Sequence, residues 1–388
     1  MKVLLSGGGT AGHITPLLAI ARELHVKSPE IQLMFIGHKG DKNIKLVENS
    51  SLNIHIETIF SGKFRRFNTL SLVRQVFNFG PNLLNLRDLI YNCVGFVQSL
   101  GKLIVNRPDV ILFKGGFVVV PLGMAARLLR IDYITHDSDS LPGLANKLIA
   151  KGAKYNAVVH KEVKYYPLSK TKVTGIPLAK EYLERAQATQ QKYKKVLGIP
   201  EDSFMLFVFT GTQGSRSIDK ALSEAVPKLL ERHKHLYLVH VFGRLNEDSQ
   251  KEQYAGLSSD LKSRIRKLLF IENAFDYIAA ADLIIGRAGA TSIAEFATIG
   301  RACVIIPAAQ LTGGHQLENA QLLSRQDAAI VLNDNDELAE ALYKACDSLI
   351  ADKKRVSELA KNIQQFGNPE AASKIAELLI EVGSKNGI

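Results

Sequence analysis

The sequence predicts an α/β protein built from two Rossmann-like halves, each a doubly wound parallel sheet. Three observations predict this fold. Short apolar runs alternate with helical stretches, the first strand of each half ends in a glycine-rich turn, and 388 residues exceed what one hydrophobic core usually serves. Ligands of such sheets bind at the carboxyl ends of the strands, so two facing halves predict one interdomain cleft.

The first half is expected to be a domain of residues 1–174. Its predicted strands are Lys2–Ser6, Ile31–Ile36, Val110–Phe113, Ile131–Thr135 and Tyr155–Val159. A helix is expected over Thr15–Val26, after the turn "SGGGTAGHITP" at positions 6–16. The amphipathic C-terminal segment, residues 369–388, is expected to pack back on this domain.

The second half is expected to be a domain of residues 175–368. It opens with a charged helix over Lys180–Val196. Its predicted strands are Phe204–Phe209, Leu236–Phe242, Leu268–Ile271, Leu283–Ile285 and Cys303–Ile306. The first of them leads into the glycine turn "TGTQGSRS" at 210–217, and a helix follows, as in the first half.

The net charge of +11 is unevenly distributed. Between Ser61 and Arg107, seven Lys or Arg residues face one acid and alternate with Phe and Leu. This mixture fits an anionic membrane surface better than nucleic acid, because clustered aliphatic side chains contribute little to phosphate contacts. A helix with a basic solvent face remains an equal alternative. The side chains expected at a membrane are Lys63, Phe64, Arg65, Arg66 and Phe67.

The first glycine turn matches the pattern GxGxxG, which on its own is weak evidence for a dinucleotide cofactor. That fingerprint also needs an acid after the second strand, where it binds ribose hydroxyls. Here the first acid is Asp41, several residues beyond the strand end at Ile36. We therefore expect no cofactor. The turn still suits an anion or polar ligand, with His13 at its mouth either capping a helix or doing chemistry.

The stretch "GRAGATSIAEFATIG" at 286–300 has two interpretations. Ser292 and Glu295 have the spacing of a capping box, which is a purely structural role. A carboxylate in the first turn of a helix can also accept hydrogen bonds from both hydroxyls of a ribose. The turn Gly211–Ser215 likewise either caps a helix or binds an anion. No spacing typical of a metal site is present, and no metal is expected.

Six segments occur in order over nearly the full chain: "GGGTAGHITPLLAIARELH", "FKGGFVVVPLGMAAR", "HDSDSLPGLANKLIAK", "GTQGSRS", "FIENAFDYIAAADLIIGRAGATSIAEFATIG" and "GGHQLENAQLL". Together they closely resemble the MurG family of N-acetylglucosaminyltransferases, which have the two-domain GT-B fold. The resemblance implies inverting transfer of N-acetylglucosamine from UDP-N-acetylglucosamine to the 4-hydroxyl of the muramyl sugar of lipid I, which forms lipid II for peptidoglycan. It also implies a peripheral enzyme on the cytoplasmic face of the bacterial cell membrane, with no nucleic-acid partner.

The resemblance assigns roles to residues of both halves. His13 matches the candidate general base, and Thr10, Ala11 and Gly12 match the loop that closes over the donor. In the second half, Thr212 matches a hydroxyl at the donor site and Ile271 the position whose backbone binds uracil. The matching nucleotide-binding loop and helix comprise Ala290, Thr291, Ser292, Ile293, Ala294 and Glu295, with Glu295 as the ribose ligand. Gln316, with His315 beside it, matches a glutamine near the donor sugar.

The sequence departs from the family pattern at three places. Ala11 replaces a glycine, Asp139 replaces an asparagine on the acceptor side, and Ala179 replaces an arginine. Asp139 is therefore a rival general base and substrate ligand, and either Arg287 or Lys180 is expected to meet the diphosphate. The alternative functions are a UDP-N-acetylglucosamine isomerase of the 2-epimerase type and a diacylglycerol glycosyltransferase of the same fold.

Overall fold

The computed structural model describes residues 1–63, 79–163, 165–244, 246–308 and 314–385. It divides into two compact units, residues 1–179 with the C-terminal segment from Pro369, and Lys180–Asn368. Residues 175–179 belong to the first unit, although the sequence places the boundary after residue 174. One reason is a hydrogen bond of 2.8 Å between His136 Nε2 and the Gly175 carbonyl. Each unit is described below by itself.

The first unit contains, within the described residues, a seven-stranded parallel sheet. Its strands are β1 (Lys2–Gly7), β2 (Gln32–His38), β3 (Ile54–Ile59), β4 (Val110–Gly115), β5 (Tyr133–His136), β6 (Tyr155–Val158) and β7 (Thr171–Val173). They lie in the order β3-β2-β1-β4-β5-β6-β7. The five predicted strands are present, and the sequence analysis missed β3 and β7, which are the two edge strands.

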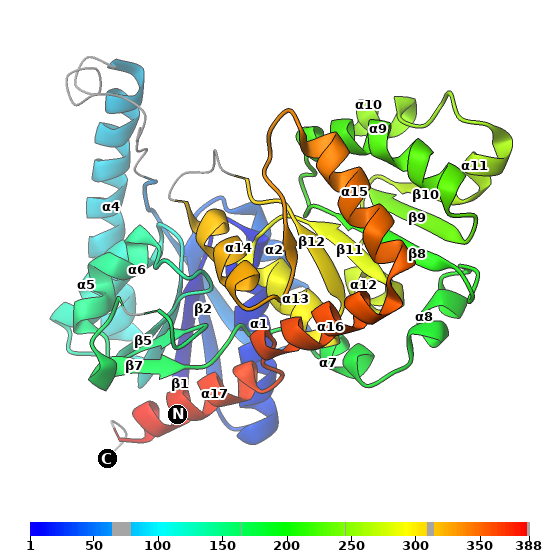
Figure 1. Cartoon of the computed structure of the whole chain (residues 1–388). Coiled ribbons are helices and arrows are strands. Elements are labelled where there is room, and N and C mark those ends of the chain that lie inside the picture. The colour runs from blue at the N-terminus through cyan, green and yellow to red at the C-terminus, as the bar shows by residue number, and fades with distance from the viewer. Residues whose placement is uncertain (64–78, 164, 245, 309–313, 386–388) are drawn as a thin grey trace. The chain divides into compact units, whose positions relative to one another are not determined.

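Helices cover both faces of this sheet because its strands alternate apolar side chains between them. Val3 and Leu5 of β1 pack with α1 (Ala11–Lys27) and α17 (Ala371–Ser384), whereas Leu4 packs on the other face with α5 (Val119–Leu128). Helix α4 (Phe79–Val105) packs against α5, and α1 lies beside α17 (Figure 1). The remaining short elements are η1 (Lys42–Ile44), α2 (Lys45–Glu48), α6 (Leu144–Ile149), η2 (Ala150–Gly152) and η3 (Leu168–Lys170).

Helix α1 begins at Ala11, four residues before its predicted start. Pro16 therefore lies in the second turn, where its missing N–H leaves the Gly12 carbonyl without the usual helical donor. A helix start at Thr15 would have put Pro16 in the first turn, where proline is well tolerated. The earlier start brings His13 into the first turn of the helix.

The second unit contains, in its described part, a six-stranded parallel sheet in the order β10-β9-β8-β11-β12-β13. Its strands are β8 (Phe204–Phe209), β9 (Leu236–Val241), β10 (Ile265–Leu268), β11 (Leu283–Gly286), β12 (Ala302–Ile305) and β13 (Ile330–Val331). The predicted strand Leu268–Ile271 is wrong in register, because β10 pairs with β9 from Ile265 to Leu268. The predicted helix Lys180–Val196 is two helices, α7 (Lys180–Ala186) and α8 (Gln190–Val196).

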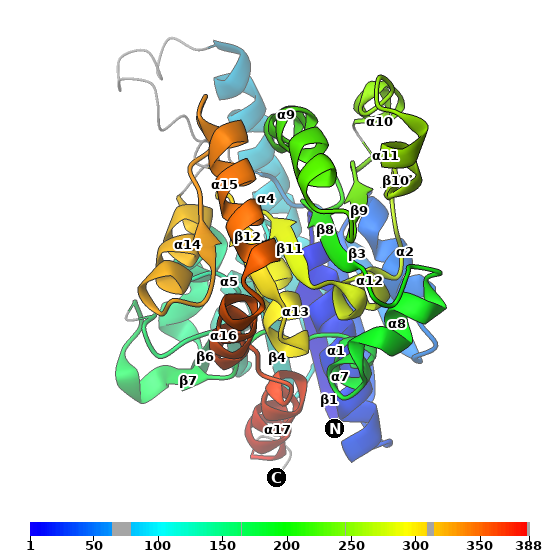
Figure 2. The same ribbon diagram turned by 45° about the vertical axis from the view of Figure 1, so that its right-hand side comes forward.

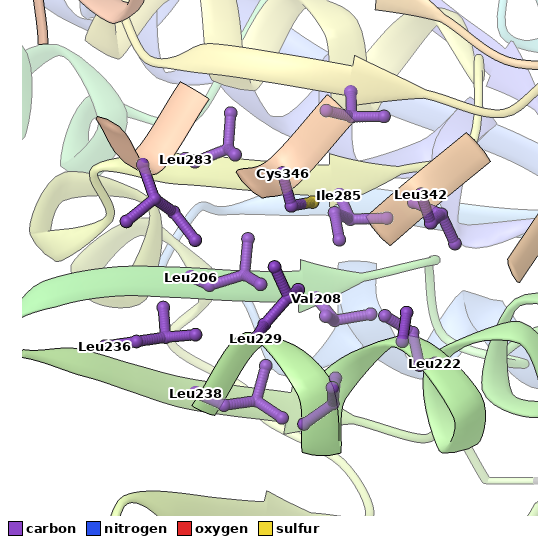
Figure 3. Close-up of a cluster of buried hydrophobic side chains, with 14 of the residues drawn as sticks. Leu206, Val208, Leu222, Leu229, Leu236, Leu238, Leu283, Ile285, Leu342 and Cys346 are labelled. Atoms are coloured by element: carbon purple, nitrogen blue, oxygen red, sulfur yellow. The ribbon is translucent and has the colours of Figure 1, made fainter. Parts of the chain in front are cut away.

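Two helices, α9 (Arg216–Arg232) and α15 (Leu338–Ala351), lie side by side on one face of the second sheet (Figure 2). Beneath them Leu206 and Val208 of β8 meet Leu222 and Leu342 (Figure 3). The opposite face is covered by α8, α12 (Ala274–Ala280) and α13 (Ala290–Ile299). The other helices are α10 (Glu247–Glu252), α11 (Ser259–Ser263), α14 (His315–Arg325), α16 (Lys353–Ile363) and η4 (Gln364–Phe366).

Each sheet reverses its strand order at one point, between β1 and β4 in the first unit and between β8 and β11 in the second. Such switch points leave a crevice at the carboxyl ends of the two central strands, where ligands of open α/β sheets bind. The segments that follow these four strands carry most of the predicted site residues.

Candidate active site

The glycine turns after β1 and β4 contact each other through their backbones in the first unit. Gly116 has a φ of +85°, and a Cβ at this position would lie 2.4 Å from the Gly8 carbonyl oxygen. Only glycine allows this approach without strain. The contact fixes the turn that carries His13 against the end of β4.

His13 is held by a hydrogen bond and is expected to be a neutral imidazole. Its Nδ1 lies 2.7 Å from the Gly8 carbonyl oxygen, so we assign the ring proton to Nδ1, which donates to that carbonyl. Nε2, which keeps its lone pair, lies on the side of Gly115. Burial and the Lys114 charge lower the pKa of His13, while Asp139 and Asp41 act in the opposite direction. The imidazole is therefore unprotonated at neutral pH.

Asp41 contacts the glycine turn itself. Its carboxylate accepts hydrogen bonds from the backbone N–H of Gly9, at 2.7 Å, and of Asn43, at 2.9 Å. Burial raises the pKa of Asp41, but these hydrogen bonds outweigh it and hold the pKa below its ordinary value. The acid that follows β2 thus stabilises the turn, which is a role that the sequence analysis did not foresee.

Asp139, the rival base, lies in the connection between β5 and α6 and is partly buried. Its charge raises the pKa of His13, so the fold brings the two candidate bases into one neighbourhood. Asp137, two residues earlier in the chain, is buried. It accepts hydrogen bonds from the Tyr166 hydroxyl, the Asn146 side chain and the Gly143 N–H. Asp137 is therefore part of the scaffold on which Asp139 is held.

Arg287, one of two cations expected at the diphosphate, forms hydrogen bonds and an ion pair within the protein. It follows β11, and its guanidinium donates to Ser215 Oγ at 2.5 Å and to Ser217 Oγ at 2.9 Å. It also pairs with Asp334 at 2.8 Å. These contacts hold the glycine turn after β8 at the switch point. Lys180, the other candidate, is an exposed residue at the start of α7.

Glu295 is not part of a capping box, and that interpretation of Ser292 and Glu295 is wrong. Helix α13 begins at Ala290 with Gly289 as its N-cap, so Ser292 already lies inside the first turn. Glu295 instead hydrogen-bonds the hydroxyl of Tyr182 on α7, and burial raises the pKa of Glu295 to about 7. A partly buried carboxyl that is hydrogen-bonded to Tyr182 still has lone pairs that can accept ligand hydroxyls.

We predict that uridine and UDP bind the wild-type chain more tightly as the pH rises through about 7. The ionised form of Glu295 is the better acceptor for ribose hydroxyls. Glu295→Gln should bind more weakly and lose this pH dependence, as titration calorimetry at pH 6 and 8 will show. Uridine, which has no phosphate, separates the Glu295 effect from phosphate ionisation. Equal pH dependence in both proteins would contradict the role.

Glu295→Gln should also change how the stability of the folded chain depends on pH. The folded-state pKa of Glu295 lies above its ordinary value of 4.5. Its contribution to stability is therefore fully present below about pH 4.5 and is lost as the pH rises through about 7. Glu295→Gln should accordingly be at least as stable as wild type at pH 8.

The other predicted donor-site residues follow strands of the second sheet. Thr212 is exposed in the turn after β8, and its carbonyl accepts a hydrogen bond from the Arg244 N–H at 3.0 Å. Ile271 lies between β10 and α12. His315 and Gln316 begin α14; the Gln316 side chain accepts from Ala308 N at 2.9 Å, whereas His315 Nδ1 is buried and has no partner among the described residues.

In the first unit, Thr10 is the N-cap of α1, and Ala11 and Gly12 are its first two residues. Lys114 and Tyr182 were not among the residues predicted from the sequence. Lys114 ends an apolar strand directly before two glycines, a position that could have identified it. Tyr182 gives no such signal, because its contact with Glu295 joins two helices far apart in the sequence. Among the described residues, no cluster of three His, Cys, Asp or Glu side chains is arranged to hold a metal ion.

Of the residues predicted to meet a membrane, Lys63 is exposed. Phe64, Arg65, Arg66 and Phe67 lie outside the described residues. Within the part of the chain that the structure describes, no helix combines the length and apolarity needed to cross a bilayer.

Family models match both units. Residues 3–158 match the glycosyltransferase family 28 N-terminal domain, and residues 205–377 match the glycosyltransferase family 28 C-terminal domain. Among solved structures, MurG of Acinetobacter baumannii is similar with a TM-score of 0.74 and 23% identity, covering 98% of this chain and 99% of that chain. A UDP-GlcNAc 2-epimerase from Neisseria meningitidis has a TM-score of 0.65 at 14% identity, covering 98% of this chain and 100% of that one. At identities of 23% and 14%, these two similarities support a shared fold and nothing further.

Curated relatives are similar over nearly their whole length. A UDP-N-acetylglucosamine–N-acetylmuramyl-(pentapeptide) pyrophosphoryl-undecaprenol N-acetylglucosamine transferase of Acetivibrio thermocellus is 31% identical, covering 98% of each chain. The enzyme of the same name from Bacillus subtilis is 30% identical over 98% of this chain and 99% of its own. This chain, with its two parallel sheets and their glycine turns, therefore belongs to the MurG family of N-acetylglucosamine transferases.

Proposed function

We propose that this chain transfers N-acetylglucosamine from UDP-N-acetylglucosamine to the 4-hydroxyl of the muramyl sugar of lipid I, with inversion, to form lipid II. Its relatives are named as N-acetylglucosamine transferases for UDP-N-acetylglucosamine and N-acetylmuramyl-(pentapeptide) pyrophosphoryl-undecaprenol, and the similarity spans both units. The observation that carries the chemistry is His13, a neutral histidine at the switch point of the first sheet with the Nε2 lone pair available.

In the proposed reaction, Nε2 of His13 accepts the proton of the acceptor hydroxyl as its oxygen bonds to the anomeric carbon. The bond between that carbon and the diphosphate oxygen breaks, and its electron pair leaves with UDP. Backbone N–H groups at the start of α9 and α13 stabilise the charge on the diphosphate. Glu295 binds the ribose hydroxyls, and Arg287 holds the α9 turn through Ser215 and Ser217.

An acceptor assay tests this proposal. Radiolabelled UDP-N-acetylglucosamine is incubated with the chain and either a lipid I analogue, diacylglycerol or no acceptor. We expect labelled disaccharide lipid in the presence of the lipid I analogue alone. Labelled diacylglycerol would instead identify the glycosyltransferase alternative. Conversion of the UDP-sugar without acceptor would identify the isomerase.

We further propose that the enzyme works as a peripheral protein on the cytoplasmic face of the bacterial cell membrane. Helix α4 presents an exposed apolar row formed by Leu86, Ile90, Val94, Val97 and Ile104, which we call the α4 stripe. The residues are spaced three, four or seven positions apart and so share one side of the helix over about 27 Å. The opposite side of α4 packs with α5.

The exposure of the α4 stripe supports this surface. Ile90 is 55% exposed and Val97 67% exposed, although the burial of such side chains normally stabilises a protein. Exposed apolar rows of this size mark interaction sites. The seven basic residues between Ser61 and Arg107 match an anionic bilayer, the occupant to which we commit.

We predict that the purified chain binds anionic liposomes and that salt weakens this binding. Replacing Lys63, Arg65 and Arg66 with Glu should weaken it by about 1 kcal/mol or more for each residue, because each basic residue near an anionic surface contributes about this much. Ile90→Ser with Val97→Ser should also weaken it, by removing the apolar contact. Liposome sedimentation at two salt concentrations measures both effects.

The matched control reverses three exposed lysines of the second unit, Lys262, Lys353 and Lys354, to Glu. This variant has the same net charge as the first-unit variant and should keep its liposome binding if the surface is local. All variants should bind UDP like wild type. If the α4 variant and the first-unit charge reversal both sediment with liposomes like wild type, the proposed surface is wrong.

A further inference from the structure

Lys114 is a buried lysine at the carboxyl end of β4, beside the candidate base. Its side chain is 2% exposed, and its stem packs beside Gly7 at the end of β1. Its Nζ donates a hydrogen bond to Ser138 Oγ at 2.5 Å. Burying an ammonium group costs free energy unless nearby carboxylates and hydrogen-bond acceptors compensate for the lost water. Burial lowers the pKa of Lys114 to about 8, against the opposing effects of Asp137 and Asp139.

The Ser138 contact joins two segments of the first-unit site. Ser138 lies between Asp137, which is fixed by Tyr166 and Asn146, and the candidate base Asp139. The ammonium group of Lys114 therefore anchors the connection after β5 to the end of β4. This anchoring places a positive charge at the end of β4, beside the end of β1.

Gly115, the residue after Lys114, lies beside the His13 ring, since its ideal Cβ position is 3.7 Å from His13 Nε2. Charged groups from three segments act on His13. They are Lys114 on β4, Asp139 in the connection after β5, and Asp41 in the connection after β2. The two carboxylates favour the imidazolium form of His13, and the lysine opposes it. An imidazolium has no lone pair with which to accept a proton. Burial, which has the largest effect, and the Lys114 charge together outweigh the two carboxylates and keep His13 neutral.

We propose that Lys114 is a positioning residue for the proton-accepting step: its buried ammonium anchors the Ser138–Asp139 connection and keeps His13 in the neutral form that accepts the proton of the acceptor hydroxyl. The consequence for the rate rests on the function proposed above. The effect of Lys114 on His13 does not, since it can be measured in the chain without substrate.

The test is a proton and carbon NMR titration of His13 in the full chain, with its signal assigned by its loss in His13→Ala. Lys114→Met keeps the apolar stem without the charge, and Lys114→Gln keeps a donor for Ser138 without the charge. In both, the titration midpoint of His13 should rise by about one pH unit, the size expected for a nearby charge. Lys114→Arg, which keeps the charge, and Lys45→Met, which removes an exposed lysine of α2, should leave the midpoint in place.

The pH profile of kcat/KM with the lipid I analogue gives the second readout. Its acid limb should move upward by the same amount in the Met and Gln variants, with UDP binding unchanged. An unmoved His13 midpoint in both neutral variants overturns the proposal, and Lys114→Gln decides if the Met variant does not fold. A moved midpoint with an unmoved acid limb shows that His13 is not the base. A moved midpoint without any transfer by the wild type refutes the proposed function and leaves the Lys114 effect intact.

Discussion

His13→Ala is expected to lower kcat by about 10²–10⁴-fold, the usual contribution of a general base. The variant loses Nε2, the atom proposed to accept the proton, and also the hydrogen bond of Nδ1 to the Gly8 carbonyl. UDP binding should change little, because Glu295 and the α9 turn belong to the second unit. Steady-state transfer to a lipid I analogue, with calorimetry for UDP, measures both quantities.

His25→Ala is the matched control, because His25 is an exposed residue of the same helix. It should have wild-type kcat. Near-normal turnover by His13→Ala would shift the role of the base to Asp139, which lies in the same neighbourhood. In that case Asp139→Asn should show the large loss instead, and a double variant should be no slower than Asp139→Asn alone.

Gly214→Ala is expected to destabilise the second unit by about 3 kcal/mol and to weaken UDP binding. Gly214 lies in the turn after β8 with a φ of +81°, and an added Cβ would lie 1.7 Å from the Phe242 carbonyl oxygen and 2.6 Å from Asn246 Nδ2. Backbone atoms cannot move out of the way as a flexible side chain can. The turn must shift, and its N–H donors shift with it.

Thermal unfolding and UDP calorimetry measure this effect. A loss of about 3 kcal/mol in a unit of this size lowers Tm by roughly 6–12 °C. Gly211→Ala separates strain from collision, because Gly211 has a φ of +91° in the same turn but nothing within 4 Å of its Cβ position. Gly211→Ala should lower the free energy of unfolding by about 1–2 kcal/mol, because alanine is less stable than glycine in the left-handed conformation. Equal losses in the two variants would show that the contact with Phe242 is unimportant.

Much of the fold could be predicted because its signals are local in the sequence. Strand β8 is a continuous apolar run, Phe204–Phe209, and both its ends were predicted correctly. The prediction failed where neighbouring strands decide the pairing. Strand β10 pairs from Ile265 to Leu268, although the apolar residues that suggested a strand begin at Leu268. The edge strand β7 has three residues, too few for an apolar pattern.

For the site, the sequence by itself determined the family and the segments that follow the central strands, because glycine turns and polar strand ends are readable in order along the chain. Only the tertiary structure decided how His13, Lys114, Asp41 and Asp139 act on one another, since these residues come from four separate segments of the chain. The tertiary structure also shows that Glu295 is hydrogen-bonded to Tyr182 and is not part of a capping box. Charge and burial depend on distance in space, and the parallel sheet sets that distance by placing strands remote in sequence side by side.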